Sequence, residues 1–279
     1  VHTVISDDSW DWSNDGPIRF ADNKDGEIYD ANYTASYKGK AKLTKNRVIP
    51  VASNNVGVSE QEHFTAKKII TPGGKTVLDF GQNMAGYVAF SLNAKARQKI
   101  TLRFGEMMKS DGEFTQDNFQ LVFGKHVTPL QQVIYTCKEG HNQYKTRFSI
   151  FGFQYVQVEA DFDINPQDFE AIAVYSNLER TGFFDCSHPL VNGLVHATVW
   201  SAKSNHLDVP TDCPTRERHA WTGDAQIFFE TVVSTARQKC QGLHELPSQF
   251  ERIGSLKDNA IAIGAAALCS ENLLERDSI

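Results

Sequence analysis

The spacing of apolar residues changes once along the chain, near Gly182. Before that point, short runs of β-branched and aromatic residues are separated by Gly, Asn, Asp and Lys. Many short strands without a helical period are typical of a β-sandwich. Beyond that point, apolar residues recur at three- and four-residue steps, which predicts helices. Strands followed by helices indicate separate domains rather than an alternating α/β sheet.

This pattern predicts a multidomain β plus α protein with three parts. Residues 1–58 are rich in Asp, Asn and Gly with aromatics between them, so we expect the short strands of a partial N-terminal β-sandwich. Residues 59–178 carry the strongest strand signal and are expected to form a β-sandwich. Residues 179–279 are expected to be helical.

The helical part begins with two predicted helices on either side of a charged loop. Apolar residues mark one face of the first helix, at Leu190, Val191, Leu194, Val195, Val199 and Trp200. Ser187 is expected to be its N-cap, with His188 and Pro189 in the first turn. The second helix, from Asp224 to Arg237, begins with an acidic residue that suits the helix dipole.

Charge and cysteine content narrow the possible partners. The net charge of −6 is spread along the chain and argues against nucleic acid, which a basic patch usually marks. No apolar run approaches the roughly 20 residues of a membrane-spanning helix, so no membrane is expected. Five cysteines without metal-ligand spacing argue against a zinc site or a disulfide framework. They favour a reducing, cytoplasmic compartment, and no metal or cofactor is expected.

The loop between the predicted helices reads TDCPTRERHAWTGD. It contains the carboxylates Asp212, Glu217 and Asp224, together with Arg216 and Trp221. Carboxylates that converge on one pocket repel each other, which raises the pKa of at least one of them. A carboxyl group kept protonated near neutral pH can act as a general acid, and a Trp face can pack against a sugar. These are the groups that glycoside hydrolysis uses.

Other interpretations of the same residues stay open. Closely spaced acids and bases commonly form a solvated salt-bridge network, which residue types alone favour over a sugar pocket. Carboxylate oxygens also suit calcium, but there is no EF-hand spacing and the arginines argue against it. His206 and His219 are expected to hydrogen-bond within the loop. Cys213 is expected to be a small buried filler, because no His is spaced to activate it.

Two tryptophans near the N-terminus, Trp10 and Trp12, flank one Asp. Burial as core anchors is the favoured interpretation, and stacking on a sugar ring is the other. The alternative to an enzyme is therefore a carbohydrate-binding β-sandwich without catalysis. Another glycosidase, or a phosphorylase, is the alternative among enzymes.

Several segments resemble one known family. The segment DVPTDCPTRERHAWTGDAQIFFET resembles the signature of the bacterial α-L-rhamnosidases of glycoside hydrolase family 78. The segments VLDFGQNMAGYVAF, LRFGEMMKSDGEFTQ and FGFQYVQVEA resemble the family's concanavalin-like β-sandwich domain. The resemblance extends from about Asp8 to Arg237. It implies an inverting hydrolase of terminal α-L-rhamnosides, with β-sandwich domains followed by an (α/α)6 catalytic barrel.

The resemblance also implies a role for each loop residue. Glu217 matches the family's general acid, and Asp212 and Asp224 match residues that bind sugar hydroxyls. Trp221 matches a residue that lines the pocket. Arg216 matches an arginine that holds neighbouring carboxylates. Rhamnose-containing glycosides or oligosaccharides are the implied partners.

The sequence departs from the family at two places. Ala220 stands where the family usually has Gly, and a positive φ there would cost about 1 kcal/mol or more. After about Arg237 nothing resembles the family, whose general base is a Glu much further along the barrel. We therefore expect residues 179–279 to be the truncated start of an (α/α)6 barrel, with both ends of the chain cut. The 279 residues alone are expected to be inactive.

Overall fold

The computed structural model describes residues 7–44, 56–180, 182–221 and 223. They divide into two compact units. The first comprises Val1–Asn54, His63–Asn83 and Tyr87–Ile172, and the second comprises Asn55–Glu62, Met84–Gly86 and Ala173–Ile279. No helix among the described residues is long and apolar enough to cross a membrane.

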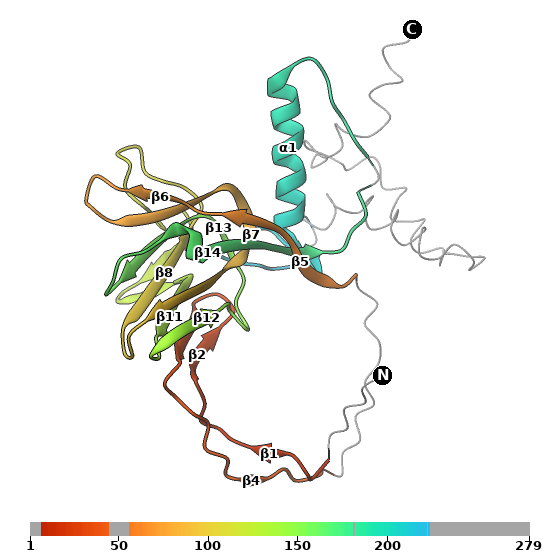
Figure 1. Cartoon of the computed structure of the whole chain (residues 1–279). Coiled ribbons are helices and arrows are strands. Elements are labelled where there is room, and N and C mark those ends of the chain that lie inside the picture. Colours follow the sequence, from red (N-terminus) through yellow and green to blue (C-terminus); the bar gives the residue numbers. More distant parts are fainter. Residues whose placement is uncertain (1–6, 45–55, 181, 222, 224–279) are drawn as a thin grey trace, which may run out of the picture. The chain divides into compact units, whose positions relative to one another are not determined.

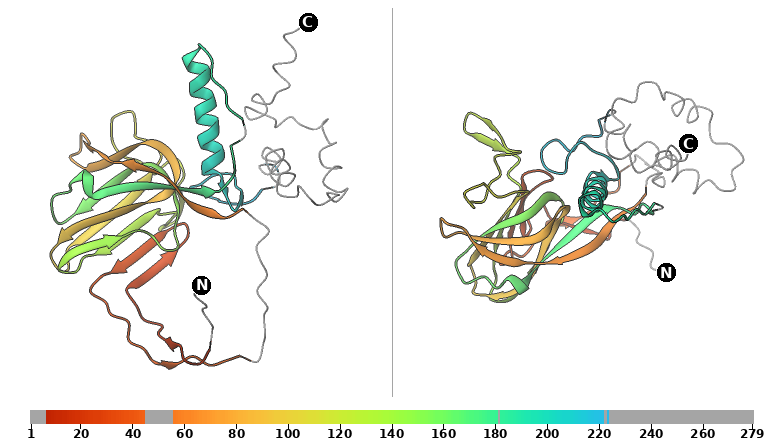
Figure 2. Two further views of the ribbon diagram at one scale, coloured as in Figure 1. Left: turned by 45° about the vertical axis from the view of Figure 1, so that its right-hand side comes forward. Right: turned by 90° about the horizontal axis from the view of Figure 1, so that it is seen from above.

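The first unit is built from strands. Most of them belong to one large sheet. Its strands are β2 (Ile18–Asp22), β3 (Gly26–Asp30), β5 (Val58–Thr65), β6 (Lys67–Ile70), β7 (Thr76–Ala94), β8 (Lys99–Gly105), β11 (Gln132–Thr136), β12 (Gly140–Tyr144), β13 (Phe151–Ala160) and β14 (Phe169–Ser176). Three of these strands, β5, β7 and β14, contain residues of both units. The order along the sheet is β2-β3-β11-β8-β13-β7-β14-β5, with β6 and β12 also paired to β7. Figures 1 and 2 show these strands curving round into the layers of a sandwich.

Alternating burial along the strands forms the core. In β8, every second side chain is buried, at Ile100, Leu102 and Phe104. The ring of Phe104 stacks on that of Phe151 in β13, with 4.2 Å between centroids. This period of two is the pattern that the sequence showed, and the predicted β-sandwich is confirmed at this level.

The hairpin of β2 and β3 joins the sheet through an unusual parallel pairing. β3 runs parallel to β11, with Gly26 opposite Gln132 and Asp30 opposite Thr136. Gly26 has a φ of +111°, and a Cβ there would lie 1.9 Å from the carbonyl oxygen of Gln132. Only glycine therefore fits this approach. Whether residues 1–58 form a domain of their own stays a prediction.

Among the described residues, two small sheets and one short helix complete the first unit. A two-stranded sheet pairs β1 (Asp11–Trp12) with β4 (Gly39–Lys40), and another pairs β9 (Leu121–Phe123) with β10 (His126–Thr128). The 3-10 helix spans Pro166–Asp168. The expected burial of Trp10 and Trp12 is wrong, because they are 49% and 45% exposed. A two-stranded ribbon has no second layer to cover its side chains.

The second unit contains helix α1 (Pro189–Ser204) and a short hairpin. The predicted helix is confirmed, but its N-cap is His188 rather than Ser187. His188 has the extended backbone of a cap but makes no side-chain capping hydrogen bond. Much of the predicted apolar face is exposed among the described residues, with Leu190 78% and Leu194 55% exposed. The second predicted helix, Asp224 to Arg237, lies outside the described residues.

Candidate functional site

The charged loop leaves the C-terminal end of α1 through a tight hairpin. Strand β15 (His206–Leu207) pairs with β16 (Val209–Pro210), and Asp208 turns between them with a φ of +71°. Asp is one of the few residue types other than Gly that adopt this left-handed backbone readily. The backbone N–H of Thr211 donates to the carbonyl of Asn205 over 2.8 Å, which closes the hairpin.

Asp212 and His219 close the loop that follows. The backbone N–H of His219 donates to Oδ1 of Asp212 over 2.9 Å, and the N–H of Asp212 donates to the carbonyl of His219 over 3.3 Å. Burial is the largest influence on the Asp212 carboxyl and by itself raises its pKa. Hydrogen bonds from the backbone of His219 and from Cys213 together outweigh burial, so the pKa of Asp212 is lowered. Asp212 is therefore held as a carboxylate.

Two side chains contact the carboxylate of Glu217, one at each oxygen. Nη2 of Arg216 lies 2.9 Å from Oε1, and Nε1 of Trp221 donates to Oε2 over 2.9 Å. The backbone N–H of Glu217 donates to Sγ of Cys213 over 3.3 Å. The Glu217 side chain is 35% exposed, so it is accessible to a ligand. The contacts come from residues one and four positions away, within a single turn of chain.

These contacts leave room for a proton on Glu217. A guanidinium and an indole N–H donate hydrogen bonds and accept none, and each of them reaches one of the two carboxylate oxygens. Because a carboxylate oxygen has two lone pairs, a second lone pair on each oxygen of Glu217 remains for a proton or a ligand.

Trp221 forms an open wall beside Glu217. Its side chain is 52% exposed, and its ring contacts that of His219 with 5.6 Å between centroids. Ala220 is not among the described residues with a positive φ, whereas Arg218 is, at +54°. The strain considered for Ala220 therefore does not arise there.

The loop thus brings two of the predicted site residues, Arg216 and Trp221, into direct contact with a third, Glu217. Asp212 joins them through His219, whose backbone it binds and whose ring contacts Trp221. Asp224 lies outside the described residues, so convergence of the three carboxylates stays a prediction.

From the sequence we predicted minor roles for three further residues, His219, Cys213 and His206. His219 does hydrogen-bond within the loop, as expected. Cys213 was expected to be buried and is only half-buried, since its sulfur faces the backbone of Glu217 rather than a core. The position of Cys213, four residues before Glu217, was the one feature of the sequence that could have indicated this contact. His206 is buried in β15, and burial lowers the pKa of its imidazole.

A hollow of about 370 Å³ lies elsewhere in the second unit. It is lined by Glu62, Arg180, Phe184 and one face of α1 that includes His196, Trp200 and Lys203. No described residue of the loop lines it. Within the described part of the chain, no group of three or more His, Cys, Asp and Glu residues is arranged to hold a metal ion.

Two models of protein families match consecutive parts of the chain. Residues 69–175 match the bacterial alpha-L-rhamnosidase concanavalin-like domain, and residues 179–240 match the bacterial alpha-L-rhamnosidase 6 hairpin glycosidase domain. The chain belongs to the bacterial α-L-rhamnosidase family. The charged loop lies within the part that matches the glycosidase domain.

Individual rhamnosidases show the same likeness. An alpha-L-rhamnosidase of Formosa agariphila is 32% identical over 253 residues, which cover 84% of this chain and 26% of that protein. One from Alteromonas sp. strain LOR is 31% identical, with 81% of this chain and 26% of that protein covered. The chain therefore spans about a quarter of the length of the curated relatives it matches.

Solved rhamnosidase structures share the fold. The native rhamnosidase of Aspergillus terreus superposes with a TM-score of 0.70 at 31% identity, covering 82% of this chain and 28% of that one. The Streptomyces avermitilis rhamnosidase complexed with L-rhamnose gives a TM-score of 0.67 at 29% identity, covering 80% and 23%.

Proposed function

We propose that the protein carrying this chain hydrolyses terminal α-L-rhamnosides, with Glu217 as the general acid. The observation that carries the proposal is the contact of Glu217 with both Arg216 and Trp221, in a loop within the segment similar to a glycosidase domain. A carboxylate beside an aromatic face suits a sugar that has one polar and one apolar side. The S. avermitilis relative, solved with L-rhamnose, supports the choice of sugar.

The other loop residues have distinct roles in this proposal. Asp212, kept ionised by its hydrogen bonds, accepts hydrogen bonds from sugar hydroxyls, and Asp224 does the same. Trp221 packs against the apolar side of the sugar. Arg216 orients Glu217 through its contact with Oε1.

The reaction inverts the configuration of the anomeric carbon. Glu217 gives its proton to the glycosidic oxygen as the bond from that oxygen to the anomeric carbon breaks. A water molecule on the opposite face forms the new bond and loses a proton to a second carboxylate, roughly 6.5–9.5 Å from the first in inverting enzymes. By the family resemblance, that carboxylate belongs to a later part of an (α/α)6 barrel.

The same resemblance supports the layout of the chain. Residues 1–58 would be part of an N-terminal β-sandwich, residues 59–178 the concanavalin-like β-sandwich, and residues 179–279 the start of the barrel. Family models for the last two kinds of domain match residues 69–175 and 179–240.

Product analysis tests the proposed function. The natural-length protein is incubated with p-nitrophenyl α-L-rhamnoside and, in parallel, with the matching fucoside and glucoside, with and without phosphate. We expect release from the rhamnoside alone, independent of phosphate, with β-L-rhamnose as the first product seen by NMR. No release, or α-L-rhamnose as the first product, would contradict the proposal. An exposed residue outside the loop, Glu179→Gln, serves as the control variant.

A carbohydrate-binding module without catalysis is the second candidate. The exposure of Trp10 and Trp12 favours it, since exposed indole rings can stack on sugars. Calorimetric binding of rhamnose-containing oligosaccharides separates the two functions. Binding that survives Glu217→Gln but is lost in Trp12→Ala, in a protein that releases no rhamnose, would support the second candidate.

A further inference from the structure

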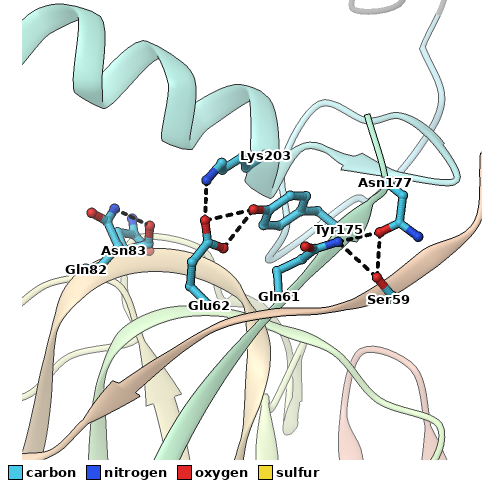
Figure 3. A network of polar contacts seen from close by, with 8 residues as sticks. All are labelled: Ser59, Gln61, Glu62, Gln82, Asn83, Tyr175, Asn177 and Lys203. Atoms are coloured by element: carbon cyan, nitrogen blue, oxygen red, sulfur yellow. Dashed lines mark hydrogen bonds and ion pairs between the residues drawn. The ribbon is translucent and has the colours of Figure 1, made fainter. Parts of the chain in front are cut away.

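A polar cluster holds the last turn of α1 to two strand segments of the same unit (Figure 3). Nζ of Lys203 forms an ion pair with Oε1 of Glu62 in β5. The hydroxyl of Tyr175 in β14 lies 2.8 and 2.7 Å from the two oxygens of Glu62 and donates to this carboxylate. One carboxylate therefore joins α1, β5 and β14.

Aromatic rings enclose the cation of this cluster. Nζ of Lys203 lies 4.5 Å from the ring centroid of Trp200 and 5.0 Å from that of Tyr175. Contacts of this kind strengthen as the cation loses water, and the Lys203 side chain is 26% exposed. An isolated surface ion pair stabilises by only about 0–1 kcal/mol, so the rings and the phenol distinguish this cluster from such a pair.

Both charges persist despite partial burial. Burial is the largest influence on Glu62 and by itself raises its pKa, but hydrogen bonds from Lys203 and Tyr175 outweigh it and the pKa is lowered. Burial by itself lowers the pKa of Lys203, but the contacts with Glu62 and Tyr175 outweigh it and the pKa is raised. The pair is therefore fully ionised at neutral pH.

Two more hydrogen bonds continue the attachment along the chain. Oγ of Ser204, the next residue, accepts the backbone N–H of Ala85 over 3.2 Å. Farther on, the backbone N–H of Asp208 donates to Oγ of Ser176 over 2.8 Å. Attachments at positions 203, 204 and 208 thus precede the loop that begins at Thr211.

A second group of side chains fixes the strand segments themselves. Oδ1 of Asn177 accepts hydrogen bonds from Ser59 and Gln61, and Gln61 also donates to Ser59 over 2.9 Å (Figure 3). The residue after β14 is therefore bound to the start of β5. The strand segments that receive Lys203 are connected to each other independently of α1.

We propose that Lys203 and Glu62 are positioning residues for the rhamnosidase site: they fix the end of α1 and, through it, the loop that carries Asp212, Glu217 and Trp221. This inference rests on the proposed function of the loop. Only Trp200 and Ser204 of α1 are buried among the described residues, so apolar packing along the helix does little to fix its end. The cluster supplies that constraint at the point where the chain leaves the helix.

Kinetics of the natural-length protein test the proposal. Lys203→Met removes the cation but keeps most of the apolar stem, and Tyr175→Phe removes only the two hydroxyl contacts. Misplacing a catalytic group by about 1 Å can cost a hundredfold in rate, so we expect Lys203→Met to lower kcat about ten- to a hundredfold. We also expect KM to rise, because the same loop carries the sugar-binding residues Asp212 and Trp221. Lys203→Arg should recover most of the lost kcat, because it restores the charge. Tyr175→Phe should give a smaller loss.

Hydrogen exchange of the backbone supplies a readout that does not depend on activity. We expect faster exchange in residues 205–221 of Lys203→Met and unchanged exchange in strands β8 and β13. The control is Lys109→Met, which removes the surface ion pair with Asp117 in the first unit and should change neither readout.

The outcomes separate the two proposals. Absence of rhamnoside hydrolysis by the unaltered protein overturns the proposed function, and with it the role of this cluster in catalysis. Hydrolysis by the unaltered protein, with kcat and loop exchange unchanged in Lys203→Met, overturns the positioning role alone. Loss of kcat that Lys203→Arg fails to recover also contradicts it, because a charge-dependent anchor should tolerate arginine.

Discussion

Glu27 is a buried carboxylate whose oxygens accept hydrogen bonds from consecutive backbone N–H groups. The groups belong to Arg147, Phe148 and Ser149, at distances of 2.7–3.0 Å. The hydroxyl of Tyr144 also donates to it. Burial and this contact raise the pKa of Tyr144 far above its usual value, so the phenol remains a donor. Glu27 thus fixes β3 to the turn that precedes β13.

Replacing Glu27 should destabilise the first unit. Glu27→Gln puts an amide N–H₂ against backbone donors, and an unsatisfied buried polar group costs about 1–3 kcal/mol. We expect a loss of this size in the free energy of unfolding, measured by urea denaturation. Glu179→Gln, on an exposed side chain, should change it by less than about 0.5 kcal/mol. Equal stability of the two variants would contradict the anchoring role of Glu27.

The carboxyl of Asp212 gives the loop a pH dependence. Its pKa is lowered in the folded protein, so ionisation stabilises the fold at pH values above the unfolded pKa, near 3.8. That contribution is lost as the pH falls through the lowered value. We expect the difference in unfolding free energy between the unaltered protein and Asp212→Asn to shrink from pH 6 towards pH 3. A difference that grows as the pH falls would show that the pKa of Asp212 is raised in the folded protein and not lowered.

At the scale of elements, α1 begins without a side-chain cap. His188 has the extended backbone of an N-cap residue, at φ −97° and ψ 108°, but its imidazole does not bond the helix N–H groups. Pro189 at the first position needs no such partner, because it has no N–H. The backbone N–H of Val191 donates to the carbonyl of His188 over 3.1 Å. A short acidic side chain at position 188 would add an acceptor for the N–H groups of this first turn.

Introducing that side chain should stabilise α1. An Asp at an N-cap contributes about 0.5–2 kcal/mol relative to a residue that does not cap, and its charge also suits the helix dipole. We expect His188→Asp to raise the thermal midpoint of the second unit, and His188→Ala to leave it nearly unchanged. A gain in both variants would indicate that removal of histidine, rather than capping, is the cause.

At the scale of the whole molecule, local patterns predicted the sandwich strands and α1 because burial repeats along each element. Those patterns did not predict the features that depend on contacts between residues distant in sequence. The exposure of Trp10 and Trp12 reflects the small sheet at this point, in which β1 pairs with β4 alone among the described residues. The parallel pairing of β3 with β11 has no local signal. The contacts among Arg216, Glu217 and Trp221 could be foreseen only as a cluster, since their geometry depends on turns within the loop.

The role of Glu217 as proton donor is tested most directly by leaving-group dependence. An alcohol must be protonated as it departs, whereas dinitrophenolate need not be. For Glu217→Gln in the natural-length protein, we predict a loss of about 10²–10⁴-fold in kcat/KM with an alkyl α-L-rhamnoside. The loss with 2,4-dinitrophenyl α-L-rhamnoside should be far smaller. Equal losses with both substrates would contradict the assignment of Glu217 as the acid.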